Sequence, residues 1–277
     1  MTPEKYPAGI ERFDIQVYDS RGFSRTTTEI IREIPLEIFL NDQRVVTIAC
    51  TGNHVKELAV GFLRAEGLIR TLTDLKKIEV SDERGTVNVY TGEVYPSPFD
   101  TSKTIYSSGA RLRRSEGEPQ YPDVGVDPSV RLRGKDGREG APFPFIAPEK
   151  VLSLMESLLE TSSLHNITHG THCSALANGN DILVLREDIG RHNTIDMVGG
   201  YTLLEGIDCS DKIILTTGRV SSEIVNKAGR LGAPVIISHS APTSQAIHLS
   251  REAGITLIGY VRGGKMNIYS QEGRVSD

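Results

Sequence analysis

Four short apolar runs recur along the C-terminal half of the chain, and this recurrence is the strongest constraint on its fold. The runs cover residues 182–185, 213–217, 235–238 and 256–261. Stretches of helical pattern follow the first three, near 192–204, from about Ser221 and from about Pro242. Strands that are apolar throughout and joined by helices are typical of a mostly parallel sheet covered on both faces. We therefore expect an α/β fold.

The first 110 residues predict a smaller α+β part. Residues 35–48 read as two strands around an Asn-Asp turn, and residues 78–90 read as a hairpin. Between them, Asn53 is expected to cap a helix that Gly67 ends. The buried stripe of that helix holds Leu58, Ala59, Phe62 and Leu63.

Residues 111–148 differ from both neighbours, because they hold six prolines, charges of both signs and few apolar anchors. We predict an exposed, extended or mobile excursion there. The main α/β part would then cover residues 149–277. Pro148 suits the first turn of a helix, since its missing N–H is not needed there. The predicted buried face of that helix holds Val151, Leu152, Met155, Leu158 and Leu159.

Composition excludes several classes of protein. The chain has 277 residues, a net charge of −5 and a mean hydropathy of −0.23, so no overall basic field points to nucleic acid. No apolar run reaches the length of about 18 residues that a membrane span needs. The N-terminus lacks the apolar segment of a secretory signal. Cys50, Cys173 and Cys209 lie far apart and form no Cys-x-x-Cys pair, which favours a reducing cytoplasm.

Each of the four apolar runs leads directly into polar residues. Residues 186–192 follow the first run, and the next two lead into 218–223 and 239–244. The fourth leads into Arg262-Gly263-Gly264-Lys265. Ligands of open α/β sheets gather beyond the carboxyl ends of the strands. The sequence thus predicts one polar site at a single sheet edge.

The chemistry of these segments indicates an anionic ligand. Helices that open at Ser221 and Thr243 would present free N–H groups and a favourable dipole. Arg219, Arg262 and Lys265 add positive charge, and the glycines would let the backbone approach closely. We expect a phosphorylated or nucleotide-like ligand, although neither a Walker loop nor a Gly-x-Gly-x-x-Gly fingerprint is present.

Structural roles remain open for the same residues. Ser221 and Thr243 could be helix caps alone, and Gly218, Gly263 and Gly264 could be turn residues. Charged side chains after the first run could instead form a structural ion-pair network, a role open to Arg186, Asp188 and Arg191.

A cluster of His165, His169, His172 and Cys173 raises the question of a metal or a nucleophile. Zinc sites usually draw ligands from two separated segments, and no second pair is obvious, so no metal site is expected. A histidine that lines the ligand pocket, or one with a structural role, is favoured instead. Cys173 beside His172 could act as a nucleophile, whereas Cys50 and Cys209 read as buried small apolar residues.

Five ordered stretches resemble one family. They read TGNHVKELAVGFLRAEGLI, THGTHCSAL, REDIGRHNTID, TTGRVSSEIVNKAGRLGAPVIISHSAPTSQAIHL and ITLIGYVRGGKMNIY. In order and spacing they are similar to the FdhD/NarQ family of formate dehydrogenase accessory proteins, over most of residues 35–270. The resemblance implies a cytidine-deaminase-like mixed, mostly parallel sheet flanked by helices, with a smaller N-terminal part, and a homodimer.

The resemblance also implies a function. Family members take sulfur from a cysteine desulfurase and pass it to the molybdenum bis(guanine dinucleotide) cofactor of formate dehydrogenase. The cofactor-binding stretch of the family falls on Tyr260, Val261, Arg262, Gly263, Gly264 and Lys265. The family's Glu-Asp-x-Gly-Arg-His motif falls on Glu187, Asp188, Gly190, Arg191 and His192, and its Thr-x-Gly-x-His motif falls on Thr168, Gly170 and His172.

Roles can be assigned within this set on the resemblance. Arg191, Arg219, Arg262 and Lys265 would neutralise phosphates, and Asp188 would hold Arg191 or a guanine edge. His172 and His192 would face the pterin.

One departure from the family pattern concerns sulfur transfer. The Cys-x-x-Cys of the family would fall on Ser108 or Gly109 and on Arg111 or Leu112, and no cysteine stands there. A serine hydroxyl cannot form a persulfide. Met197 also replaces a lysine common in the family.

Three readings of the function follow. Cys173 could substitute for the missing pair, so that the chain is a sulfurtransferase. Alternatively, the chain is a cofactor-binding chaperone without sulfur transfer, or a nucleotide-binding regulator unrelated to formate dehydrogenase. Zinc-deaminase chemistry is disfavoured, since the Pro-Cys-x-x-Cys ligand segment is missing.

Overall fold

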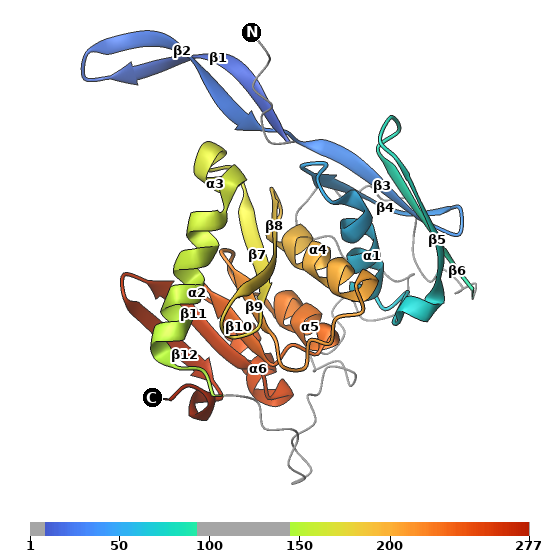
Figure 1. Cartoon of the computed structure of the whole chain (residues 1–277). Coiled ribbons are helices and arrows are strands. Elements are labelled where there is room, and N and C mark those ends of the chain that lie inside the picture. The colour runs from blue at the N-terminus through green and yellow to red at the C-terminus, as the bar shows by residue number, and fades with distance from the viewer. Residues whose placement is uncertain (1–8, 93–144, 277) are drawn as a thin grey trace.

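The computed structural model describes residues 9–92 and 145–276 (Figure 1). The N-terminal region holds a four-stranded sheet in the order β4-β3-β6-β5. Its elements are β3 (Ile34–Leu40), β4 (Gln43–Cys50), α1 (Val55–Ala65), β5 (Leu75–Ser81) and β6 (Thr86–Thr91). Both predicted hairpins are confirmed, and so is the α1 stripe, whose four residues are buried.

Helix α1 begins differently from the prediction. Asn53 is not the N-cap; the N-cap is His54, whose φ of 50° is left-handed, and its side chain does not cap the helix. The end of the helix follows the prediction. Gly67 has a φ of +77°, and the next backbone N–H, of Leu68, bonds to the carbonyl oxygen of Leu63. This is the glycine-ended arrangement common at helix C-termini.

The C-terminal region holds a six-stranded mixed sheet in the order β12-β11-β10-β9-β7-β8. Its strands are β7 (His172–Ala177), β8 (Ile182–Asp188), β9 (Ile213–Thr216), β10 (Val235–Ser238), β11 (Thr256–Arg262) and β12 (Lys265–Ser270). The expectation of a mostly parallel sheet holds only in part. β9, β10 and β11 pair in parallel, but β7 pairs antiparallel with both neighbours and β12 pairs antiparallel with β11. Neither β7 nor β12 was expected as a strand from the sequence.

Helices cover both faces of this sheet. They are α2 (Pro148–Thr161), α3 (Ser163–Thr168), α4 (Arg191–Leu204), α5 (Ser222–Leu231) and α6 (Ser244–Ala253). Buried side chains of α2 pack against one face, and those of α4, α5 and α6 pack against the other. On α2, Leu154 is buried, whereas the predicted Leu152 and Leu159 are only half-buried. Single helical turns of 3-10 type complete the described elements at Leu72–Asp74 and Glu272–Arg274.

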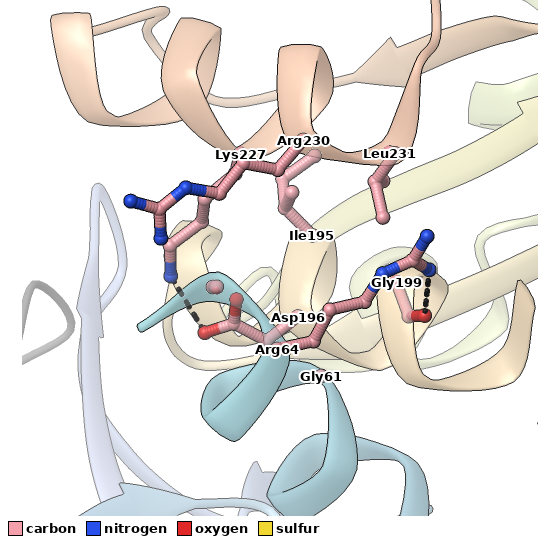
Figure 2. A pocket seen from close by; sticks show the side chains of 9 residues that line it. Gly61, Arg64, Ile195, Asp196, Gly199, Lys227, Arg230 and Leu231 are labelled. Carbon is pink, nitrogen blue, oxygen red and sulfur yellow. Dashed lines mark hydrogen bonds and ion pairs between the residues drawn. The ribbon is translucent and has the colours of Figure 1, made fainter. Parts of the chain in front are cut away.

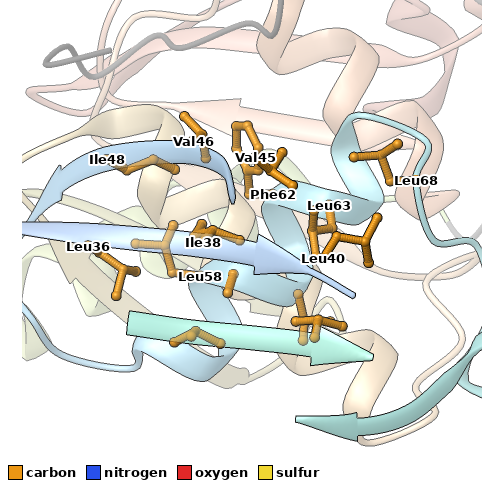
Figure 3. Packing of buried hydrophobic residues seen from close by; sticks show 14 of the residues in the cluster. Leu36, Ile38, Leu40, Val45, Val46, Ile48, Leu58, Phe62, Leu63 and Leu68 are labelled. Carbon is orange, nitrogen blue, oxygen red and sulfur yellow. The ribbon is translucent and has the colours of Figure 1, made fainter. Parts of the chain in front are cut away.

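Helix α4 joins the two regions. Eleven of its fourteen residues are buried, because the sheet lies on one side of it and α1 lies on the other. Met197 and Leu203 of α4 belong to the same buried cluster as the α1 stripe and the four-stranded sheet. Figure 3 shows how side chains of α1, among them Leu58 and Phe62, pack on that sheet. The layers are therefore α2, the six-stranded sheet, α4 to α6, α1 and the four-stranded sheet.

A long hairpin projects from this body (Figure 1). It pairs β1 (Ile10–Asp19) with β2 (Gly22–Ile31) in antiparallel register as a sheet of its own. Most of its residues are exposed. We call it the arm.

Some expectations fall outside the described residues. The predicted excursion at 111–148 lies there except for its last four residues, and so do Ser108 and its neighbours. Among the helices in the described part of the chain, none is long and apolar enough to cross a membrane.

Candidate functional site

The four polar segments meet at one edge of the six-stranded sheet. β8, β9, β10 and β11 run in the same direction, so their carboxyl ends lie at this edge. β7 runs the other way and begins there, which sets His172 opposite Asp188 in the register. The antiparallel insertion of β7 therefore adds the His172 segment to the edge that the parallel strands were predicted to form.

Arg191 and the segment after β9 pack directly against each other. Arg191 is the first residue of α4, and a Cβ placed on Gly218 would lie 2.8 Å from the Cβ of Arg191. Glycine at 218 is thus required by close approach and not by a turn conformation. Arg219 follows at once and is exposed.

Electrostatic effects link several cations at this edge. Burial and the charges of Arg191, His165 and Arg219 lower the pKa of His172. Burial and the charge of Arg219 lower the pKa of Arg191, and Glu223 opposes that shift. On the β10 side, burial, Arg262 and His165 lower the pKa of His239. We call these six residues the cationic cluster: His165, His172, Arg191, Arg219, His239 and Arg262.

Two buried polar atoms at the cluster make no hydrogen bond within the described part of the protein. They are Nε of Arg191 and Oγ of Ser221. Ser221 occupies the N-cap position of α5, but its side chain does not cap the helix, whereas Thr243 accepts a hydrogen bond from the Ala246 N–H at 3.2 Å. The cap explanation thus fits Thr243 and fails for Ser221. Donors without partners beside like charges are suited to an anion.

Hydrogen bonds of side-chain hydroxyl groups hold the segments that follow β9 and β10 in place. Thr217 Oγ1 accepts from the Cys173 N–H at 2.9 Å, which ties the β9 exit to β7. Ser238 Oγ donates to the Gly218 carbonyl at 2.8 Å and accepts from the Ser240 N–H at 3.0 Å. The β9 and β10 exits are therefore fixed to each other through backbone groups.

The Arg262-Gly-Gly-Lys265 segment is the turn between β11 and β12. Gly263 and Gly264 have φ values of +57° and +69°, the pattern of a two-residue hairpin turn. No other atom lies within 4 Å of a Cβ placed on either, so the conformation, not close approach, requires glycine here. In the register of the two strands, Lys265 lies opposite Arg262 across the turn, and its side chain is exposed.

Tyr260 and Val261 occupy a register shift in β11. Tyr260 has a left-handed φ of 59°, and the guanidinium carbon of Arg262 lies 3.7 Å from the centre of its ring. Val261 is 1% exposed and belongs to the core beneath α2, so its side chain cannot contact a ligand at this edge. Val261 could contact a ligand only through its backbone atoms.

Asp188 does not have the role expected of it. It is completely buried, and its two oxygens accept four hydrogen bonds. The donors are the N–H and hydroxyl of Thr51, the N–H of Gly190 and the amide of Asn193. It therefore binds neither Arg191 nor a guanine edge. Asp188 instead fastens the end of β4 to the start of α4.

Two other charged residues of this segment also have structural roles. Glu187 accepts hydrogen bonds from the N–H groups of Leu164 and His165 at 3.0 and 2.8 Å, so it caps the first turn of α3. Arg186 forms a two-point ion pair with Glu57 of α1, with N–O distances of 2.5 and 2.8 Å. Of the alternatives left open, the ion-pair network fits Arg186 but not Arg191.

His192 and Asp196 point into a buried ionic cluster between α4 and α5. His192 is 4% exposed, and its Nε2 lies 3.4 Å from Glu223, so it does not face the solvent edge. Asp196 pairs with Lys227 at 2.6 Å, beside a cavity of about 10 Å³ (Figure 2). Lys227 also lies 3.7 Å from Glu223. Burial raises the pKa of Asp196 to about 6.

The Thr-x-Gly-x-His stretch connects the arm to the site. A Cβ on Gly170 would lie 2.7 Å from Ile31 at the end of the arm, and the Gly170 N–H donates to Thr168 Oγ1. His165 Nδ1 lies 2.7 Å from the Thr171 carbonyl oxygen. Within residues 9–92 and 145–276, no group of three or more histidine, cysteine or acidic side chains is placed to hold a metal ion.

All three cysteines are buried. Burial raises the pKa of Cys50 and of Cys173 to about 12, and it raises the pKa of Cys209. A buried thiol with a raised pKa is a poor nucleophile and a poor sulfur acceptor at neutral pH, because little of it is thiolate. The environment of Cys173 therefore disfavours the role suggested for it.

Two contributors to the site were not among the residues predicted for it: His239 joins the cationic cluster, and Thr51 holds Asp188. His165, one of the histidines that could line the ligand pocket, joins the same cluster. His239 could have been identified from the sequence, because it is the first residue after a predicted strand and therefore lies at the edge of the sheet. Thr51 gave no signal, since its partner lies 137 positions away in sequence.

Comparison with known proteins gives one consistent result. The model of the FdhD/NarQ family matches residues 31–276. The sulfur carrier protein FdhD of Bacillus subtilis (strain 168) is 34% identical over 268 residues, covering 95% of this chain and 97% of that protein. The protein of the same name from Geobacillus kaustophilus (strain HTA426) is 35% identical over 267 residues, with 96% and 97% covered.

A solved structure is similar throughout. It is a protein from Desulfotalea psychrophila, provisionally assigned as a formate dehydrogenase accessory protein. The TM-score is 0.75 at 24% identity, with 96% of this chain and 99% of that chain covered, so the two share a fold. The family match, over most of the chain, and the identity to its members lead to one conclusion: this protein belongs to the FdhD/NarQ family.

Proposed function

We propose that this protein is a formate dehydrogenase accessory protein that binds the molybdenum bis(guanine dinucleotide) cofactor and supports delivery of sulfur to it. The relatives named sulfur carrier proteins and the family match favour the accessory role. The observation that carries the binding role is the cationic cluster. Arg191 and Arg219 lie close enough to His172 for their charges to lower its pKa, and Arg219 also lowers the pKa of Arg191.

The residues at the edge fit a diphosphate group. Arg191, Arg219 and Arg262 would neutralise it, and Ser221 Oγ with the first N–H groups of α5 would donate hydrogen bonds. Tyr260 and the Gly263-Gly264 turn border the same side as Arg262. When bound, the cofactor supplies the metal and the pterin sulfur ligands; the part of this chain is to bind and orient it.

The nucleotide part of the proposal can be tested with guanosine diphosphate. At about 100 times Kd, the ligand should stabilise the protein by roughly 2.7 kcal/mol, seen as a higher Tm. Arg262→Glu and Arg219→Glu should each abolish the shift. Arg84→Glu, in the turn between β5 and β6, changes the net charge equally and should preserve it. An unchanged shift in Arg219→Glu would remove the cluster from the binding site.

A second candidate, cofactor binding without sulfur transfer, is favoured by the state of the cysteines. Every thiol of the chain is buried, and no cysteine stands at Ser108, Gly109, Arg111 or Leu112. Cysteine desulfurase would then not be a partner, whereas the catalytic subunit of formate dehydrogenase would remain one.

Intact mass spectrometry distinguishes the two candidates. The protein is incubated with a cysteine desulfurase and cysteine, and its mass is measured without reductant. A gain of about 32 Da, one sulfur atom, that is lost in Cys173→Ala supports sulfur carriage by this chain. An unmodified mass, with guanosine diphosphate binding intact, supports binding alone.

We also propose a cytidine-deaminase-like fold and a location in the cytoplasm. The order β8-β7-β9-β10-β11 with one reversed strand agrees with a cytidine-deaminase-like arrangement. The free cysteines agree with a reducing cytoplasm.

A further inference from the structure

A carboxylate lies in the first turn of α5, where the site presents hydrogen-bond donors to an anion. Glu223 is the second residue of that helix, two positions after the N-cap residue Ser221. Its side chain is 17% exposed, and its Oε1 makes no hydrogen bond with any described residue. A negative charge here interacts favourably with the N-terminal end of the helix, but it also competes with a bound anion for the same N–H groups. A site suited only to strong anion binding would not contain it.

Glu223 lies beside the start of α4, which carries Arg191. The Arg191 side chain packs along Gly218, in the segment that leads into α5: a Cβ placed on Gly218 would lie 2.8 Å from its Cβ and 3.2 Å from its Cδ. The next residue, His192, has its Nε2 3.4 Å from Oε2 of Glu223. Burial and Arg219 lower the pKa of Arg191, and the charge of Glu223 opposes that shift. The same carboxylate would therefore act on an anion bound by Arg191.

The neighbouring lysine does not neutralise Glu223. Lys227 pairs with Asp196 at 2.6 Å, whereas its Nζ lies 3.7 Å from Oε1 of Glu223 (Figure 2). Burial opposes the charge of Lys227, yet its pKa is raised, because three carboxylates act on it: those of Asp196, Glu223 and Glu66. One ammonium group shared among three carboxylates leaves negative charge over. Glu223 is the member of this group that lies in the first turn of α5, next to the site.

A carboxylate in this place limits the negative charge that the site accepts. A guanosine diphosphate that is esterified at both ends has a charge of about −2 near neutral pH, whereas guanosine triphosphate, whose terminal phosphate ionises twice, has a charge of about −4. We propose that Glu223 is a specificity-determining residue that favours guanosine diphosphates esterified at both ends over guanosine triphosphate. This inference rests on the proposed function, because the guanine dinucleotide part of the cofactor is such a diester.

The size of the effect follows from Coulomb's law. With a separation of about 10 Å and an effective dielectric constant of about 40, between the values for a protein surface and for water, one further ligand charge weakens binding roughly 4-fold through its repulsion by Glu223. Guanosine triphosphate carries about two more charges than the diester. Removing the charge of Glu223 should therefore change the preference between the two ligands by about 10-fold.

The test measures the affinity of the full chain for guanosine diphosphate mannose, a diester, and for guanosine triphosphate. Isothermal titration calorimetry is carried out with a chelator, so that no divalent cation neutralises the phosphates. The wild type should bind the diester more tightly. In Glu223→Gln, the ratio of the triphosphate Kd to the diester Kd should fall about 10-fold. Comparing this ratio between the two proteins cancels the difference in shape between the ligands. A wild type that prefers the triphosphate, or an unchanged ratio in Glu223→Gln, would overturn the proposal.

Two control variants separate charge from structure. Glu223→Asp keeps the carboxylate and should keep the wild-type ratio, which a loss of packing alone would not explain. Glu205→Gln makes the same chemical change at an exposed position, at the opposite end of α4 from Arg191, and should also keep the ratio. If Glu223→Gln does not fold, the order of the two wild-type affinities still decides. A wild type that binds neither ligand would refute the proposed function itself, whereas binding with an unchanged ratio in Glu223→Gln would refute only the role of Glu223.

Discussion

Gly61 of α1 and Gly200 of α4 lie against each other where the two helices cross. A Cβ on Gly61 would lie 1.7 Å from the carbonyl oxygen of Asp196, and one on Gly200 would lie 1.9 Å from that of Glu57. Both atoms belong to helix backbone, which cannot turn aside as a flexible side chain can. The contact between the N-terminal region and the main sheet region therefore depends on the absence of two methyl groups.

Gly61→Ala and Gly200→Ala should each destabilise the protein by at least about 3 kcal/mol, because the helices must separate. Urea unfolding measures the change. Gly273→Ala serves as the control, since no atom lies within 4 Å of its added Cβ, and it should change the free energy of unfolding by less than about 0.5 kcal/mol. Wild-type stability in Gly61→Ala would show that the helices do not cross this closely.

Lys227→Met should destabilise the protein by about 3–5 kcal/mol, because it leaves Asp196 buried without its partner at 2.6 Å. The double variant Asp196→Leu with Lys227→Met should recover at least half of that loss. Lys77→Met, which removes the exposed ion pair with Glu79, should cost less than about 1 kcal/mol. A double variant no more stable than Lys227→Met would contradict the assignment.

Glu66 should make stability depend on pH. Burial, and then the nearby carboxylates of Asp196 and Glu223, raise its pKa from 4.5 to about 7, although Lys227 and Arg230 oppose the shift. A group whose folded pKa is raised contributes stability that is complete below pH 4.5 and is lost as the pH rises through 7.

Glu66→Gln should therefore match the wild type at pH 4.5 and exceed its stability at pH 8, by on the order of 1–3 kcal/mol. Urea unfolding at the two pH values measures both. The exposed Glu205→Gln should show no such difference. A Glu66→Gln variant with the same pH profile as the wild type would refute the raised pKa.

His172 should make nucleotide binding depend on pH. Its pKa is lowered in the free protein by burial and by Arg191, His165 and Arg219. A bound anion would neutralise those cations and raise the pKa again, so binding takes up a proton and tightens as the pH falls. The affinity for guanosine diphosphate should change by about 3- to 10-fold between pH 8 and pH 6.

The control is His172→Gln, which should have a flatter profile. Subtracting the pH profile of this variant from that of the wild type removes the effect of the titration of the phosphate itself, which occurs near pH 6. His165 and His239 remain in both proteins and cancel in the same way. If the affinity of the variant and that of the wild type change with pH in the same way, His172 lies outside the binding site.

The sequence determined part of the local structure and the family. Apolar runs and glycines sufficed for the two N-terminal hairpins, the α1 stripe, and strands β8 to β11, because burial and turn conformation act over a few residues. The polar segments that follow those strands could also be placed at one edge of the sheet, because the carboxyl ends of parallel strands lie at the same edge.

Only the tertiary structure decided what each charged residue does. Six ionisable side chains stand between Arg186 and Asp196, and Arg191 alone joins the cationic cluster. Arg186 pairs with Glu57, Glu187 caps α3, Asp188 holds Thr51, His192 lies beside Glu223 and Asp196 pairs with Lys227. Their partners come from other elements, 22 to 137 positions away in sequence for the pairs with hydrogen bonds. Charge is a long-range interaction whose effect depends on burial and on the partner, and neither is a property of the local sequence.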